Sequence, residues 1–415
     1  MLNYETVKAR IGALLHGASH SAGPALVPLP ATLDRPEGRR RYLVAAPPGK
    51  TKCARALVIV LHGAGASAEQ VLGLSFPPSP LSVWLEIAAR EQCVVIAPDA
   101  GKGGWSDCFA RPARVARKDD VGYIDALIEQ AIAEHDVDPA RVYLIGVSRG
   151  GWMAYRVATA IPHRLAAFSV VLAGMPPPGR ASMPATPLPA LIFGCTADPL
   201  IHYQGGKPWY AFGFAEPVRG IEQSVQAWRE LAGLPDTPEV VRLPARDARG
   251  KTSATRFMWG QAADGMQVGL YRIDGAGHAE PSRLKRYPRF INWLTGLQNA
   301  DLEVAEAAWD FFREKRARLS PCDRHGSPSR ATPRQWLDDR PIHHGEHHAA
   351  NPGACRHIVL DGHGLQCRHL RLHGRTGCLQ GARGQAVPAQ GAAAGSGRHR
   401  IRRFGGRAVD RHLQR

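Results

Sequence analysis

The sequence lacks several features that mark membrane, exported and metal-binding proteins. No apolar run approaches the roughly 18 residues that a membrane-spanning helix needs, so we expect no membrane partner. The N-terminus carries Glu5, and only residues 11–15 resemble the apolar part of a signal peptide, which favours the cytoplasm over export. No two cysteines have the Cys-x-x-Cys spacing of a metal or redox site.

Cysteine is also sparse in the first 320 residues. Cys93 and Cys195 lie at predicted strands, where we interpret them as small buried apolar side chains. Cys53 and Cys108 leave one disulfide open as an alternative.

The basic charge is concentrated at one end of the chain. The formal net charge is +17, but residues 321–415 alone hold 16 Arg, no Lys and six acidic residues. The first 320 residues are therefore only moderately basic, and nucleic acid is not the partner that they favour.

Residues 320–415 differ in composition from the rest and are predicted to be an Arg-, His- and Gly-rich tail of low order. One alternative is a basic arm that binds nucleic acid or another anion. A metal site is a weaker alternative, since the cysteine and histidine spacings fit no zinc pattern. We favour the hypothesis of an out-of-frame translation of GC-rich DNA, because Arg occurs without Lys; intact-mass analysis of the native product tests it. The residues of the metal alternative are Cys355, His357, Cys367, His369, His373 and Cys378.

Strand and helix patterns alternate through the middle of the chain. We predict a helix and linker over residues 1–38, then one catalytic domain over residues 39–319, an α/β fold with a mostly parallel sheet and helices on both faces. The expected strands are 41–46, 56–61, 93–97, 142–145, 167–173, 190–194, 240–243, 256–259 and 268–273. The expected helices are 3–15, 82–90, 119–135, 221–231, 287–297, 301–319 and one following Ser148.

The most informative stretch joins a predicted strand to a predicted helix at Gly146-Val147-Ser148-Arg149-Gly150. So short a connection forces Ser148 into a strained conformation, and it needs small neighbours at Gly146 and Gly150. This turn lifts the serine hydroxyl above the sheet edge and aims the N–H of Arg149 at the same point. The pattern predicts a nucleophile beside half of an oxyanion hole, although an ordinary strand-to-helix turn is the alternative.

Three further segments follow predicted strands and are expected to supply a second oxyanion donor, an acid and a base. A His62-Gly63-Ala64-Gly65 loop is expected to hold the second oxyanion donor, with His62 itself structural. Asp198 is the favoured acid over Asp99 and Asp274, and His278 is the favoured base. Because ligands bind beyond the carboxyl ends of parallel strands, these groups are expected to converge on Ser148. An imidazole oriented by a carboxylate is what a serine hydroxyl needs to attack an ester.

The segments LHGAGAS, DDVGYIDALI, DPARVYLIGVSRGGWMAYRVA, GCTADPLIHYQGG and GAGH resemble the polyhydroxybutyrate depolymerase family of esterases, with its feruloyl and acetyl-xylan esterase relatives. The resemblance covers residues 40–319. It implies an α/β-hydrolase fold and carboxylic ester hydrolysis with Ser148 as nucleophile, Asp198 as acid and His278 as base. It also implies oxyanion donors at the N–H groups of Arg149 and a residue near Ala64.

Two positions depart from the family pattern. The family often has an aromatic residue directly after the base, where this chain has Ala279-Glu280, and the loop Trp105-Ser106-Asp107-Cys108 matches only in part. Trp105 is expected at the substrate pocket, with covering the core edge as an equal alternative. Tyr203 is also placed at the pocket, although its motif beside the acid favours the alternative of shaping a loop.

The sequence thus predicts a serine esterase that forms an acyl-enzyme on a polyhydroxyalkanoate oligomer or a phenolic or acyl ester. No metal or organic cofactor is expected, and the sequence does not set the oligomeric state. The alternatives are a serine peptidase of the same fold, a nucleic-acid-binding protein that uses the tail, and a scaffold without activity, against which the complete Ser148, Asp198 and His278 set argues.

Overall fold

The computed structural model describes most of the chain between residues 25 and 318. All described residues belong to the first of two units, Met1–Pro333, and the second, Arg334–Arg415, lies wholly outside them. The expected helix over 3–15 and the expected tail over 320–415 therefore fall outside the described part. The described residues are 25–49, 51, 53–109, 118–177, 183, 186–207, 217–246, 250–262 and 265–318.

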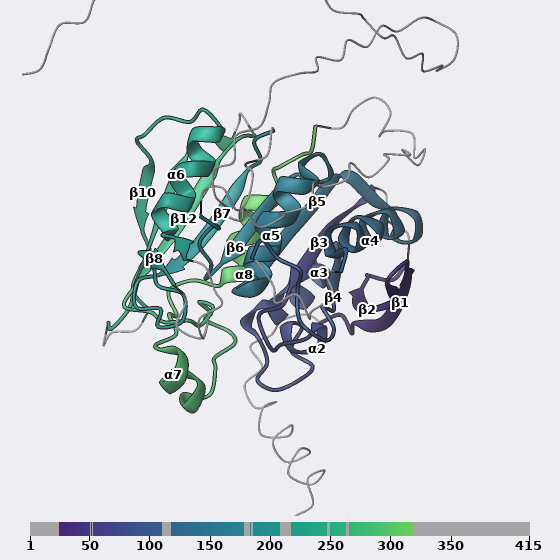
Figure 1. Ribbon diagram of the computed structural model, residues 1–415, viewed down its shortest axis with the longest axis horizontal. Coiled ribbons are helices and arrows are strands. Elements are labelled where there is room, and N and C mark those ends of the chain that lie inside the picture. Colours follow the sequence, from purple (N-terminus) through teal and green to yellow (C-terminus); the bar gives the residue numbers. More distant parts are fainter. Residues whose placement is uncertain are drawn as a thin grey trace, which may run out of the picture. The chain divides into compact units, whose positions relative to one another are not determined.

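A ten-stranded sheet runs through this unit in the order β1-β2-β4-β3-β5-β6-β7-β12-β11-β10 (Figure 1). The six central strands, from β4 to β12, are parallel, and the strands at both edges pair antiparallel. The mostly parallel sheet predicted from the sequence is confirmed. The strands are β1 (Leu29–Arg35), β2 (Gly38–Ala45), β3 (Arg55–Leu61), β4 (Val94–Pro98), β5 (Val137–Val147), β6 (Ala167–Val171), β7 (Ala190–Cys195), β10 (Glu239–Arg242), β11 (Ser253–Trp259) and β12 (Val268–Asp274). A separate ribbon pairs β8 (Gly205–Gly206) with β9 (Val218–Arg219).

Helices cover both faces of the sheet, as expected. On one face lie α4 (Asp120–His135), α5 (Arg149–Ala160) and α6 (Ile221–Leu231). On the other lie α3 (Trp84–Glu91) and α8 (Val304–Phe312). The remaining helices are short: α2 (Ala68–Val71), η1 (Pro80–Val83), η2 (Pro162–Arg164) and α7 (Arg289–Thr295). Among the helices of the described part, none combines the length and apolar character that crossing a bilayer requires.

Strand β3 is buried on both faces, which accounts for the unbroken apolar sequences of the central strands. Leu57, Ile59 and Leu61 face one hydrophobic core, and Val58 and Val60 face the other. Every residue of this strand is buried. A parallel strand between two helical layers has no solvent face, so it shows no polar alternation.

The predicted linker is wrong over its last part. Residues 29–35 form β1, which pairs antiparallel with β2 from Leu29 opposite Val44 to Arg35 opposite Gly38. The sheet therefore begins before the expected domain boundary at residue 39, with β1 as its edge strand and β2 between β1 and β4. Pro30 argued against a strand in the sequence. Proline is nevertheless tolerated at a sheet edge, because no neighbouring strand there needs its missing N–H.

The last helix is shorter than expected. It ends at Phe312, after which the chain turns and the N–H of Ala317 donates to the carbonyl of Ala140 at 2.9 Å. Lys315 is buried with its Nζ atom 2.6 Å from the Gln267 Oε1 atom. The segment that follows the helix still packs against β5, because the Tyr143 hydroxyl donates to the Lys315 carbonyl at 2.9 Å.

Candidate active site

Ser148 occupies the sharp turn between β5 and α5. Its backbone angles are φ 54° and ψ −119°, a left-handed conformation that a residue with a Cβ atom rarely adopts. The Ser148 N–H donates to the carbonyl of Val171 in the neighbouring strand at 2.8 Å. The strained conformation expected from the sequence is present, and the adjacent strand holds it in place.

The two glycines of the turn are required by close backbone approach. A Cβ atom on Gly146 would lie 2.1 Å from the Gly150 carbonyl oxygen. A Cβ atom on Gly150 would lie 2.3 Å from the Leu61 carbonyl oxygen, across the sheet in β3. The steric reason for both glycines is therefore confirmed.

His278 follows β12 on a loop that is fixed by main-chain contacts. Its N–H donates to the Thr295 carbonyl at 2.5 Å, and the Gly277 N–H donates to the Leu297 carbonyl at 2.8 Å. The side chain reaches across the sheet edge, so that its Nε2 atom lies 3.0 Å from the Ser148 Oγ atom. The base and the nucleophile expected from the sequence are thus within hydrogen-bonding distance.

Asp198 follows β7 and completes a chain of three side chains. Its Oδ2 atom lies 2.6 Å from the His278 Nδ1 atom. Its Oδ1 atom accepts hydrogen bonds from the N–H groups of Leu200 at 2.8 Å and Ile201 at 2.9 Å. A carboxylate accepts, so Nδ1 carries the proton and Nε2 is left to accept from the serine hydroxyl.

The two competing acids lie elsewhere. Asp99 has its Oδ1 atom 3.6 Å from the Nε2 atom of His62. Asp274 accepts from the Arg272 Nε atom at 2.9 Å. Only Asp198, of these three carboxylates, contacts the imidazole of His278.

Two backbone N–H groups are available beside the serine. Arg149 is the first residue of α5, so its N–H has no partner within the helix. Ala64 lies on the loop after β3, which passes close to the serine: a Cβ atom on Gly63 would be 3.5 Å from the Ser148 Cβ atom. Among the described residues, neither the Arg149 N–H nor the Ala64 N–H has a hydrogen-bond acceptor. Both remain candidates to bind a developing oxyanion.

The Ala64 loop is held from behind by Trp105 and His62. Trp105 is fully buried, and its indole N–H donates to the His62 carbonyl at 2.9 Å. The His62 Nε2 atom accepts from the Ala100 N–H at 3.1 Å, and its Nδ1 atom donates to the Gly63 carbonyl at 2.9 Å. The burial of Trp105 fits the expected role of covering the core edge, and the contacts of His62 fit a structural role.

Tyr203 shapes the loop after Asp198. It is buried, its hydroxyl donates to the Glu222 Oε1 atom at 3.0 Å, and its carbonyl accepts from the Ile221 N–H at 2.8 Å. Burial, together with the nearby Glu222, raises the pKa of the Tyr203 phenol far above its ordinary value. The expected pocket position is not observed, and the alternative role in shaping the loop accounts for the contacts.

The partner of the Arg149 side chain was not predicted from the sequence. The Arg149 Nε atom donates to the Asp107 Oδ2 atom at 2.7 Å, and its guanidinium also donates to the Trp105 carbonyl at 3.1 Å. The Asp107 Oδ1 atom in turn accepts from the Phe109 N–H at 3.0 Å. This buried carboxylate fixes the residue that carries one candidate oxyanion N–H. The sequence offers little indication of this contact, because Asp107 lies on a loop that matches the family pattern only in part.

Glu280, two residues after the base, was noted only as a departure from the family pattern. It is a buried carboxylate whose Oε1 atom accepts from the Ser79 hydroxyl at 2.8 Å and whose Oε2 atom accepts from the Tyr287 hydroxyl at 2.9 Å. Burial and this carboxylate raise the pKa of the Tyr287 phenol well above its ordinary value. Glu280 thus ties the His278 loop to the segment before η1.

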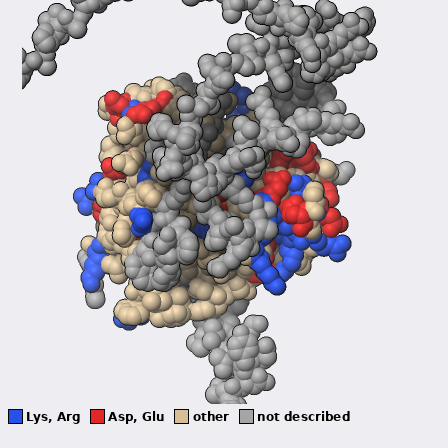
Figure 2. Space-filling view, in the orientation of Figure 1, with Lys and Arg blue, Asp and Glu red and all other residues tan. Residues whose placement is uncertain are grey.

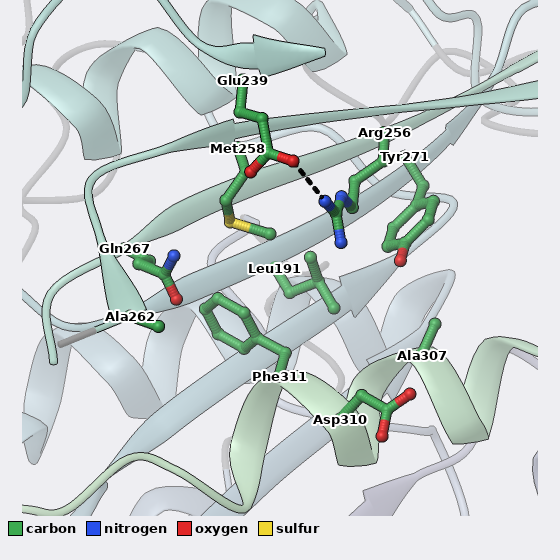
Figure 3. Close-up of a pocket in the computed structure, with 10 residues that line it drawn as sticks. All are labelled: Leu191, Glu239, Arg256, Met258, Ala262, Gln267, Tyr271, Ala307, Asp310 and Phe311. Carbon is green, nitrogen blue, oxygen red and sulfur yellow. Dashed lines mark hydrogen bonds and ion pairs between the residues drawn. The ribbon is translucent and has the colours of Figure 1, made fainter. Parts of the chain in front are cut away.

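A separate cavity of about 250 Å³ lies among β10, β11, β12 and α8 (Figure 3). The figure shows Glu239 pointing at Arg256, and these two side chains form an ion pair at 2.9 Å. None of the predicted site residues lines this cavity. It is not part of the arrangement around Ser148.

Within the described part of the chain, no group of three or more His, Cys, Asp or Glu side chains could hold a metal ion. The four described cysteines are free, and burial raises the pKa of the Cys108 thiol to about 12. The cysteines and histidines of the alternative metal site all lie outside the described residues.

Comparisons with known proteins identify the family of this chain. The profile described as "Alpha/beta hydrolase family" matches residues 58–287. The protein named "Putative esterase NocK" from Nocardia uniformis subsp. tsuyamanensis is 30% identical over 286 residues, which cover 66% of this chain and 79% of that protein.

Other relatives match over shorter segments. "Feruloyl esterase B" from Piromyces equi is 26% identical over 46% of this chain, and "Poly(3-hydroxybutyrate) depolymerase" from Ralstonia pickettii is 29% identical over 38%. The chain spans about a third of the length of these two proteins, 35% and 32%. The solved structure of "Acetyl xylan esterase from Aspergillus awamori" is 14% identical with a TM-score of 0.45, covering 69% of this chain and 99% of that one.

Proposed function

Because the chain belongs to the alpha/beta hydrolase family and is a carboxylic ester hydrolase of that family, we propose that it works through an acyl-enzyme on Ser148. The observation that carries the proposal is the hydrogen-bonded chain from Ser148 Oγ through His278 to Asp198, with links of 3.0 and 2.6 Å. A serine in this setting can lose its proton as it attacks a carbonyl carbon.

In the first step the Ser148 oxygen bonds to the ester carbonyl carbon while its proton passes to His278 Nε2. Asp198 stabilises the imidazolium that forms, and its second oxygen is held by two backbone N–H groups, so the carboxylate does not have to reorganise. The imidazolium then returns the proton to the leaving alkoxide. The products of this step are an alcohol and an acyl group bonded to Ser148.

The oxyanion is proposed to bind to the N–H groups of Arg149 and Ala64. Both are backbone donors, and the Arg149 N–H lies at the N-terminus of α5, where the helix dipole favours negative charge. The salt bridge from the Arg149 guanidinium to Asp107 fixes the position of this residue. This arrangement supports stabilisation of charge that develops in the transition state.

In the second step water attacks the acyl group, with His278 now taking a proton from the water. The tetrahedral intermediate collapses, the acid leaves, and the proton returns to Ser148. Every proton transfer uses the same Nε2 atom, so the base alternates between acceptor and donor. The chemistry proposed here uses only groups of this chain.

For the substrate we propose an acyl ester with a phenolic or hydroxyalkanoate acyl group. The support comes from the names of the relatives, which include a feruloyl esterase and a poly(3-hydroxybutyrate) depolymerase.

The test is hydrolysis of p-nitrophenyl butyrate by the full chain, with Ser148→Ala beside it. Turnover should fall roughly 10⁴-fold or more in the variant, because no other group supplies the nucleophile. Ser169→Ala is the matched control: Ser169 lies in the neighbouring strand β6, and its buried hydroxyl has no hydrogen-bond partner among the described residues.

A fluorophosphonate probe adds a second readout. It should modify the wild type at Ser148, as peptide mass analysis would detect, and leave Ser148→Ala unmodified. Equal turnover by Ser148→Ala and wild type would reject the proposal, and faster cleavage of an aminoacyl p-nitroanilide than of the ester would favour a peptidase.

A further inference from the structure

Seven large apolar side chains lie exposed on two segments that meet at the short helix α7. We call them the α7 surface. They are Leu74, Phe76, Leu284, Phe290, Trp293, Leu294 and Leu297, with exposed fractions of 54, 51, 47, 54, 83, 59 and 43%. Figure 2 shows mostly uncharged side chains at the end of the described molecule where Figure 1 places α7. An apolar cluster of this extent on a soluble fold indicates a contact surface.

Two segments far apart in the sequence form this surface together. The rings of Phe76 and Phe290 stack with centroids 6.0 Å apart and an interplanar angle of 23°. The two segments are also joined beneath, where Glu280 accepts from both Ser79 and Tyr287. Helix α7 itself has no fully buried residue. Its apolar side chains therefore do not serve the protein core.

The α7 surface adjoins the groups proposed for catalysis. Thr295, the last residue of α7, accepts from the His278 N–H at 2.5 Å, and Leu297 accepts from the Gly277 N–H at 2.8 Å. On the other side, a Cβ atom on Gly296 would lie 3.7 Å from the carbonyl oxygen of Ala197, the residue before Asp198. A material held on α7 would therefore be held beside the base and the acid.

The two segments that form the surface carry charge of one sign only. Residues 283–297 contain Arg283, Lys285, Arg286 and Arg289 and no acidic residue, and residues 72–80 contain no charged residue. Lys285 pairs with Glu86 at 3.2 Å, whereas exposed Arg289 has no ion-pair partner among the described residues. The surface is complementary to a partner that is both apolar and negatively charged.

We propose that the α7 surface adsorbs the protein onto a water-insoluble polyester whose surface carries carboxylate groups, so that its ester bonds reach Ser148 from the solid phase. The inference rests on the proposed function, because ester hydrolysis itself leaves a carboxylate at each new chain end. The apolar side chains contact the polymer, and the cations contact those carboxylates. Adsorption does not require the serine.

The main test compares one soluble and one solid substrate. The soluble substrate is p-nitrophenyl acetate, and the solid is a suspension of poly(ε-caprolactone) particles treated with mild alkali to expose carboxylates. The variant is Trp293→Gln with Leu294→Gln in the full chain, because glutamine forms helices nearly as well as leucine. Val240→Gln is the matched control, an apolar side chain 55% exposed on the edge strand β10.

The double variant should keep its kcat/KM for the soluble ester within twofold of wild type and lose at least tenfold in particle binding and in particle hydrolysis. Val240→Gln should match wild type in all three assays. Arg289→Glu should bind alkali-treated particles at least fivefold more weakly than wild type, with a smaller loss on untreated particles. Ser148→Ala should still bind the particles.

Particle binding within twofold of wild type by the double variant would overturn the inference. It would also be overturned if wild type bound phosphatidylglycerol vesicles more tightly than the particles, or formed a dimer that the double variant cannot form. Failure of the proposed function looks different, since wild type and Ser148→Ala would then hydrolyse the soluble ester equally.

Discussion

The Oδ2 atom of Asp198 lies 2.6 Å from the Nδ1 atom of His278, and the other oxygen of the same carboxylate is held by the N–H groups of Leu200 and Ile201. The acid is thus fixed from one side by backbone and binds the imidazole from the other. This geometry allows one tautomer of His278, the one with its Nε2 atom free to accept from Ser148.

Asp198→Asn is expected to lower kcat for p-nitrophenyl butyrate by about 10³- to 10⁴-fold, because the amide can donate to Nδ1 and so favours the wrong tautomer. The measurement is steady-state turnover, with circular dichroism to verify the fold. Asp274→Asn serves as control, since Asp274 pairs with Arg272 and does not touch the imidazole. A loss of less than tenfold for Asp198→Asn would count against this role.

Glu280→Gln is expected to lower the free energy of unfolding by about 1–3 kcal/mol, because the new amide N–H₂ would face a hydroxyl that now donates to the carboxylate. Since Glu280 anchors the His278 loop, kcat should fall as well. Urea unfolding and turnover measure the two effects. Tyr287→Phe removes one hydrogen-bond donor and keeps the charge of Glu280, so it should lose less unfolding free energy and less kcat than Glu280→Gln. Larger losses for Tyr287→Phe would contradict the explanation.

Gly150→Ala is expected to destabilise the fold by about 2–3 kcal/mol, because its methyl group would collide with the backbone carbonyl of Leu61. Backbone in the middle of a sheet cannot move aside as a flexible side chain can. Urea denaturation gives the change. Gly63→Ala is the stability control, because its Cβ atom would make only ordinary contacts at 3.5 Å or more; equal losses for the two variants would refute the steric argument.

Glu303→Gln is expected to change the pH dependence of stability. Burial raises the pKa of the Glu303 carboxyl, and its buried Oε1 atom has no hydrogen-bond partner in the described part of the chain. A pKa that is higher in the folded state than in the unfolded state means that protonation of Glu303 stabilises the fold. This stabilisation is complete below the pKa of the unfolded state, and it is lost as the pH rises through the pKa of the folded state.

Relative to wild type, Glu303→Gln should therefore gain stability as the pH rises from about 4 to 8, since the amide stays neutral. Urea midpoints of both proteins across this range measure the difference. A difference that stays constant, or that shifts toward wild type at high pH, would show that the carboxyl is not destabilised by burial.

The central strands and the loops that carry Ser148, Asp198 and His278 could be predicted because they depend on local signals. The strand at residues 56–61 is apolar throughout, and the turn at Gly146 and Gly150 tolerates no other residue without a collision. The carboxyl ends of parallel strands meet at one edge, so topology alone implied that the three loops converge.

The predictions failed where long-range contacts decide the outcome. Trp105 lies on a glycine-rich loop, but its indole points inward because the His62 carbonyl needs a donor there. Strand β1 carries Pro30 and an exposed face, so it shows no signal until β2 is known to lie beside it. The buried carboxylates of Asp107 and Glu280 find their partners 42 and 201 residues away, and no local pattern predicts such pairs.

His278 is held from behind by carbonyl groups of Thr295 and Leu297, through main-chain hydrogen bonds of its own residue and of Gly277. Such bonds do not depend on which side chains α7 carries. Substitutions can therefore change the exposed side chains of this helix, and with them the material that the α7 surface is proposed to bind. The position of the His278 imidazole relative to Ser148 would stay the same. Recognition and reaction can evolve separately, although a few residues of one loop join them.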